Sequence, residues 1–189
     1  MRKLSYAAAL LLLSLVGCMQ ESNLTEPVNG IEKTPWKSII LLPAKSYLST
    51  EDVFTSSQQI SGATGGEIHM IKNYQAMDGH TVSIDCKLTV PSSSLSFGDS
   101  RDITMQISDE AGVEFFPSMT FDQPVVLNLT ISGLNLDGVN PNDVSFYYVD
   151  PNGSLAPTVN DGVTVDLATG TLKVINAQLP HFSRWAYAR

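Results

Sequence analysis

The residues best suited to chemistry stand near the end of the chain, in the tripeptide His181-Phe182-Ser183. A hydroxyl follows a bulky apolar residue, and an imidazole stands just upstream. In an extended strand, His181 and Ser183 point to the same face and lie about 6.5–7 Å apart along the chain. The pattern is typical of two things: a strand that ends, or a peptide bond built to break.

The other polar groups form no comparable pattern. His69, His80 and His181 are far apart and share no metal-ligand spacing, so we predict no metal site. The Asn- and Asp-rich residues 135–143 could bind calcium, but they lack the spacing of a helix-loop-helix site, and β connections use the same residue types. The Gly-rich residues 62–66 are not followed by Lys and fail as a phosphate loop. No cofactor is therefore predicted.

Aromatic residues cluster in two short segments towards the C-terminus. They are Phe146, Tyr147 and Tyr148 in one segment and Trp185 with Tyr187 in the other. Exposed together, they would form a platform for a glycan or a protein. Aromatic residues in strands more often fill the core, so both interpretations stay open at this point.

The N-terminus carries an export signal. Arg2 and Lys3 precede an apolar stretch, residues 7–16, that is too short to span a membrane as a mature helix. Leu15-Val16-Gly17-Cys18 resembles the bacterial lipobox, in which cleavage occurs before the cysteine and a lipid is attached to its sulfur. We therefore predict a signal peptide at 1–17, lipidation of Cys18, and a place in the cell envelope, at the outer membrane or cell surface.

Charge limits the partners. The formal net charge is −8, and loss of Arg2 and Lys3 with the signal peptide would change it to −8 − 2 = −10. An acidic surface repels phosphate backbones, so we predict no nucleic-acid partner. Attachment to a membrane would come from the acyl chains on Cys18, each buried methylene contributing roughly 0.8 kcal/mol.

Residues 18–37 are polar, contain Pro and Gly, and read as a flexible tether. Residues 36–43 are apolar and end at a proline, which favours a packed strand or arm. The chain has two cysteines, so lipidation of Cys18 leaves Cys86 without a disulfide partner. Cys86 alternates with Val82, Ile84, Leu88 and Val90, and we expect a buried, inert thiol.

The rest of the chain has the period of β-strands. Further strands are expected at 67–74, 102–108, 113–116, 125–132, 144–149, 162–166, 171–175 and 182–188, separated by turns rich in Gly, Asp and Asn. No stretch after the signal peptide has a helical period. The sequence predicts a single all-β domain at 38–189, a mostly antiparallel β-sandwich.

Four pieces of sequence carry a family resemblance. In order they are Ser61-Gly62-Ala63-Thr64-Gly65-Gly66, Leu88-Thr89-Val90-Pro91-Ser92-Ser93-Ser94-Leu95, Val113-Glu114-Phe115-Phe116-Pro117 with Phe121-Asp122-Gln123-Pro124-Val125-Val126-Leu127, and His181-Phe182-Ser183. Together they resemble the β-sandwich domain shared by ankyrins, netrin receptors, zonula-occludens scaffolds and a self-cleaving death-domain protein, over about residues 58–189. The chain departs from that family at Ser92-Ser93-Ser94, where a glycine is common, and lacks the length for a second sandwich or a death domain.

The resemblance implies the sandwich fold, and it gives the tripeptide roles. In self-cleaving members the serine attacks the preceding carbonyl, so here Ser183 would be the nucleophile, the Phe182 carbonyl the target and His181 the base. Cleavage also needs a distorted peptide and an oxyanion donor, neither of which a sequence reveals. In a continuous strand Trp185 and Tyr187 share the face of His181 and Ser183, so Phe182 and Trp185 could both point inward only if the strand bulged between them.

We therefore expect the tripeptide to lead into the last strand and to stay uncut in most molecules. The leading functional prediction is a non-enzymatic envelope lipoprotein, a binding or structural module for an unknown protein or glycan. The alternatives are a self-cleaving domain, cut between Phe182 and Ser183, and a glycan- or calcium-binding adhesin-like module.

Overall fold

The fold is all β, as predicted. The computed structural model describes residues 37–47 and 51–189, which contain eleven β-strands and one three-residue 3-10 helix, η1 (Pro141–Asp143). The predicted signal peptide, Cys18 and nearly all of the predicted tether lie outside the described residues. Within the described ranges, no helix is long and apolar enough to cross a membrane.

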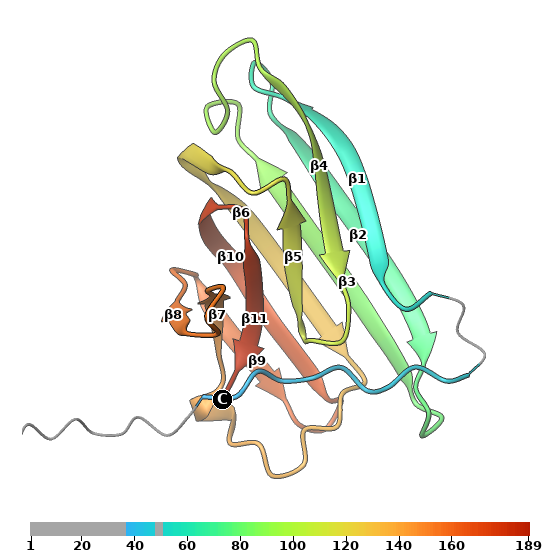
Figure 1. Ribbon diagram of the computed structural model, residues 1–189. Coiled ribbons are helices and arrows are strands. Elements are labelled where there is room, and N and C mark those ends of the chain that lie inside the picture. Colours follow the sequence, from blue (N-terminus) through green and yellow to red (C-terminus); the bar gives the residue numbers. More distant parts are fainter. Residues whose placement is uncertain (1–36, 48–50) are drawn as a thin grey trace, which may run out of the picture. The chain divides into compact units, whose positions relative to one another are not determined.

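The strands form two antiparallel sheets (Figure 1). The six-stranded sheet has the order β1 (Phe54–Ser61), β4 (Ser100–Ile107), β5 (Gly112–Phe116), β11 (Arg184–Ala188), β7 (Ser145–Val149) and β8 (Leu155–Pro157). The five-stranded sheet has the order β2 (Gly66–Gln75), β3 (Thr81–Val90), β6 (Thr120–Ser132), β10 (Thr171–His181) and β9 (Gly162–Asp166). The chain passes repeatedly from one sheet to the other, and the inner faces of the two sheets enclose a common core.

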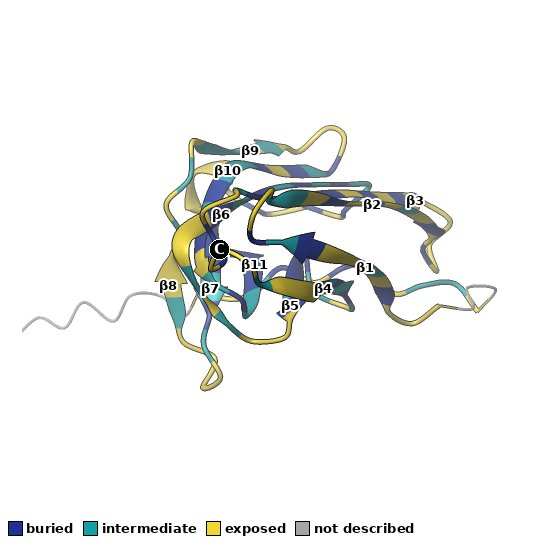
Figure 2. Cartoon of the chain, turned by 90° about the horizontal axis from the view of Figure 1, so that it is seen from above, coloured by how far each residue is buried: buried dark blue, intermediate teal, exposed yellow. Residues whose placement is uncertain are grey.

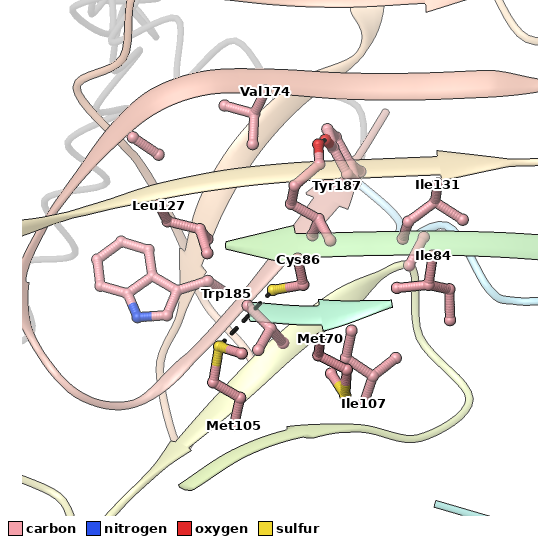
Figure 3. Close-up of a cluster of buried hydrophobic side chains, with 14 of the residues drawn as sticks. Met70, Ile84, Cys86, Met105, Ile107, Leu127, Ile131, Val174, Trp185 and Tyr187 are labelled. Carbon is pink, nitrogen blue, oxygen red and sulfur yellow. Dashed lines mark hydrogen bonds between the residues drawn. The ribbon is translucent and has the colours of Figure 1, made fainter. Parts of the chain in front are cut away.

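The core lies between the sheets, and alternating residues of each strand fill it (Figure 2). In β3 every second residue is buried, from Val82 through Cys86 to Val90, as the alternation predicted. Tyr187 of β11 crosses the core, and its hydroxyl donates a 2.6 Å hydrogen bond to the carbonyl of Leu129 in β6. Side chains from both sheets surround Cys86 in the close-up (Figure 3).

The predicted strands are mostly confirmed, with several differences. β1 and β8 were not predicted, β6 begins earlier, at Thr120, and β10 continues past residue 175 to His181. Correspondingly, the last strand begins at Arg184 instead of residue 182. A bulge between Phe182 and Trp185 is therefore not needed to bury both, because β10 ends in one sheet and β11 begins in the other; the register of β10 does shift beside Pro180, between Leu179 and His181.

Residues 37–46, which we call the strap, run across one end of the sandwich and connect the two sheets (Figure 1). Ser38 exchanges two main-chain hydrogen bonds with Arg189, of 2.8 and 3.1 Å, and Ile40 donates to the carbonyl of Tyr187 at 2.9 Å. At its other end the strap bonds to the β2–β3 hairpin, where Ser46 donates to Gln75. Ile40 and Leu42 are buried in the core, so the packed arm predicted for this segment is confirmed.

Two lysines hold the strap through aromatic rings. The ammonium of Lys37 lies 4.4 Å from the centre of the Tyr147 ring and donates to its hydroxyl. That of Lys45 lies 4.1 Å from the centre of the Phe54 ring, and burial lowers the pKa of Lys45. A cation over an aromatic face is attracted by the ring quadrupole, the more so when water is excluded. The strap is thus fastened to both sheets by main-chain and side-chain contacts.

Two buried tyrosines, Tyr74 and Tyr187, lead us to expect a fall in stability at alkaline pH. Burial, with a smaller contribution from Asp78, raises the pKa of Tyr74 to about 12, and its hydroxyl donates to the strap carbonyl of Pro43 at 2.9 Å. Burial also raises the pKa of Tyr187. The unfolded chain releases these protons from about pH 10 and the folded chain later, so stability should fall as the pH rises from about 10 towards 12.

Urea unfolding at pH 8 and at pH 11 measures this effect. Tyr74→Phe removes one of the two groups, so its stability should fall less between these pH values than that of the wild type. Equal falls in the two proteins would contradict a raised pKa at Tyr74.

Candidate functional site

The tripeptide lies at the point where the chain passes from one sheet to the other. His181 is the last residue of β10 and pairs with Thr120 of β6, whereas Arg184 begins β11 and pairs with Glu114 of β5. Phe182 and Ser183 span the distance between the sheets. This position explains how Phe182 and Trp185 can both be buried, since the chain changes sheets between them.

Main-chain hydrogen bonds fix this crossover on both sides. The Phe182 amide donates to the carbonyl of Met119 at 2.7 Å, and the amide of Phe115 donates to the carbonyl of Ser183 at 3.0 Å. The ring of Phe182 stacks on Phe115 with centroids 4.8 Å apart and meets the edge of Phe121 at 4.6 Å. Phe182 therefore joins β5, β6 and the crossover into one aromatic cluster.

The imidazole of His181 is held by two other rings. Its centroid lies 4.7 Å from that of Tyr148 and 5.4 Å from that of Trp185. Among the described residues, no hydrogen bond joins the His181 ring to the Ser183 hydroxyl. The proposed base and nucleophile are thus neighbours in sequence, but they are not paired in this structure.

Ser118, which sequence reasoning did not single out, lies at the Phe182 carbonyl. Its hydroxyl donates to the carbonyl oxygen of Phe182 across 3.4 Å, from the connection between β5 and β6. If Ser183 attacked, negative charge would develop on that carbonyl oxygen, and a hydrogen-bond donor there would stabilise it. Ser118 stands 64 residues before Phe182 in the chain, so only the fold brings the two groups together.

The aromatic platform considered from sequence is wrong. Phe146, Tyr147, Trp185 and Tyr187 are all buried, and only Tyr148 is partly exposed. Phe146 meets the edge of the Tyr187 ring inside the core, at 5.0 Å. The indole nitrogen of Trp185 is buried and has no hydrogen-bond partner in the described part of the chain.

His69, His80 and the polar residues 135–143 make local contacts. His69 contacts Asp85 at 2.7 Å, and His80 contacts Asp78 at 3.2 Å, each as a separate exposed pair. No group of three or more His, Cys, Asp or Glu residues that could hold a metal occurs in the described ranges. In residues 135–143 the side-chain oxygens of Asn135 and Asn140 accept from nearby backbone amides, which is the geometry of turns.

A shallow polar hollow lies on the outer face of β4, β5 and β11. Gln106, Ser108, Glu110, Glu114 and Arg184 line it. The Arg184 guanidinium contacts the Glu110 carboxylate at 3.6 Å. A Cβ on Gly112 would lie 2.3 Å from the Trp185 carbonyl oxygen, so a glycine is needed for β5 to lie this close to β11.

Comparison of the chain with protein-family models, with curated proteins and with solved structures found no match.

Proposed function

We propose that this chain is a non-enzymatic lipoprotein of the bacterial cell envelope, whose β-sandwich acts as a binding or structural module. The lipobox-like residues Leu15-Val16-Gly17-Cys18 support the anchor. The contacts that hold the strap to both sheets are the observation that best supports a domain attached through its N-terminus. A domain held by an N-terminal anchor needs its first residues fixed to its body, and the strap meets this need.

The groups that could do chemistry also support a non-enzymatic role. Cys86 is fully buried beside Met105, and burial raises the pKa of its thiol. The imidazole of His181 is held between aromatic rings. These side chains contribute to packing, whereas a nucleophile or a base needs access to a substrate.

The anchor is tested by Cys18→Ala. Wild type and variant are produced in a bacterial host with lipoprotein processing, and membrane and soluble fractions are compared. We expect the wild type to partition with membranes and the variant to lose most of that association, because its acyl chains are gone. A variant that stays as firmly bound as the wild type would place the anchor elsewhere.

Self-cleavage is the second candidate, and Ser118 is the observation that favours it. The Ser183 oxygen would add to the Phe182 carbonyl carbon, with the Ser118 hydroxyl donating to the carbonyl oxygen. The carbon–nitrogen bond would then break, the Ser183 nitrogen would take the hydroxyl proton, and water would hydrolyse the ester. His181 would have to leave Tyr148 and Trp185 to act as the base.

Denaturing mass spectrometry separates the two candidates. Cleavage would release residues 183–189, a piece of 189 − 182 = 7 residues that could stay paired in the sheet under native conditions. If the bond breaks, Ser183→Ala should abolish the shortened species and Ser118→Ala should slow its formation. A shortened species that persists in Ser183→Ala would rule out this mechanism.

A further inference from the structure

Within residues 37–47 and 51–189, each sheet ends in strands whose outer backbone edge has no neighbouring strand. The four edge strands are β1 and β8 in one sheet and β2 and β9 in the other. An unpaired edge can add a strand from another chain, and natural proteins discourage this with short strands, charges or proline. The four edges differ in how they are protected.

Three of the edges carry such protection. β8 has three residues and ends in Pro157. β9 has five residues and ends in Asp166. β2 is longer, but Glu67 and Lys72 lie on it, and these residues pair with Lys87 and Glu51. These features match the known devices against edge-to-edge pairing.

The edge strand β1 has none of these three protective features: it is not short, and it carries no charge and no proline. Its sequence, FTSSQQIS, is eight residues long and contains no charge and no proline. Among the described strands it pairs only with β4, through a continuous register from Phe54 opposite Ile107 to Ser61 opposite Ser100. Thr55, Ser57, Gln58 and Gln59 are exposed, and no described strand pairs with the outer edge of β1.

We propose that β1 pairs antiparallel with β1 of a second copy of this chain, in the register that places Ser57 opposite Ser57. The six-stranded sheets of the two copies would then continue into each other. The chain carries a formal net charge of −8, so two copies repel over most of their surfaces. Residues 54–66 contain no charged residue, so this repulsion is weak along the edge of β1.

This register also keeps each face of the sheet intact. Residues opposite each other would have numbers that sum to 114, so Thr55 opposes Gln59, Ser56 opposes Gln58 and Phe54 opposes Ile60. Side chains directly opposite in an antiparallel pair lie on the same face. The buried residues Phe54 and Ile60 would thus meet on the inner face, and hydroxyl and amide groups would meet elsewhere. A shift of one residue would place inner side chains opposite outer ones.

Disulfide trapping tests both the partner and the register. The full chain with Ser57→Cys is produced in cells, membranes are treated with a mild oxidant, and dimers are measured on a non-reducing gel. Directly opposite residues have Cα atoms about 4.5–5.5 Å apart, which suits a disulfide. Wild type is the control for Cys18 and for the buried Cys86.

Two further variants serve as matched controls on the same face of β1. Thr55→Cys or Gln59→Cys alone would lie about 13 Å from its own counterpart, four residues away along the strand, so neither should form a dimer above the wild-type level. Produced together, the two variants should form the mixed disulfide.

The expected result is a reducible dimer with Ser57→Cys and with the mixed pair only. The proposal is overturned if Ser57→Cys gives no dimer above wild type while a maleimide labels its thiol. It is equally overturned if the three single variants give equal dimers, which indicates random collision, or if Ser57→Cys instead links to a different protein.

Discussion

Cys86→Asp is expected to prevent folding. Cys86 is fully buried, and its Sγ lies 4.0 Å from the Sδ of Met105 in the centre of the sandwich (Figure 3). Burial, with a smaller contribution from the charge of Asp85, already raises the pKa of the thiol, which shows how strongly this site disfavours negative charge. An unpaired buried charge costs several kcal/mol, against a total stability of about 5–15 kcal/mol for a domain.

Cys86→Ala is the matched control. It removes one sulfur atom without adding charge, so we expect a loss of about 1–2 kcal/mol, small beside that of Cys86→Asp. Urea unfolding followed by tryptophan fluorescence measures both variants. The native wild-type thiol at position 86 should also resist labelling, and rapid modification by a thiol reagent would show that the site is open.

Phe182→Ala is expected to cost about 3–5 kcal/mol, the usual loss for truncating a buried phenylalanine. The Phe182 ring contacts Phe115 and Phe121, which belong to different sheets. Its removal leaves a cavity where β10 passes into β11. The same urea titration measures the loss.

Ser183→Ala is the control, because it removes the hydroxyl that could react and leaves the packing of the crossover unchanged. Its main chain can still accept from Phe115, and no buried ring is lost, so its stability should stay within about 0.5 kcal/mol of the wild type. If Phe182→Ala were as mild as Ser183→Ala, the aromatic cluster would not be what holds the crossover.

The strands that sequence predicted well are those with one buried and one exposed face. In β3 the alternation is unbroken, so its period identifies both the strand and its inner face. β1 was missed because its inward positions Ser56 and Gln58 are polar and reach solvent at the edge of the sandwich. β10 was predicted too short because its register shifts between Val174 and Ala177, where Asn176 has a φ of +50°. Such a bulge interrupts the period of two.

The tripeptide His181-Phe182-Ser183 shows a second limit of prediction from sequence. The sequence predicted that His181, Phe182 and Ser183 lead into one strand at 182–188, and spacing along one strand could not reveal a change of sheet. Phe182 faces the core together with Trp185 only because the chain changes sheets between them. The contact of Ser118 with the Phe182 carbonyl joins distant segments, and no local pattern marks it.

We propose that this protein is a lipid-anchored domain that remains in one piece. Denaturing intact-mass spectrometry of the wild-type chain, extracted from membranes of a lipoprotein-processing host, tests it most directly. We predict one main species that begins at lipidated Cys18 and ends at Arg189, which is 189 − 17 = 172 residues plus the acyl groups. A main species without lipid on Cys18 would contradict the anchor, and one that ends at Phe182 would make this a self-cleaving domain.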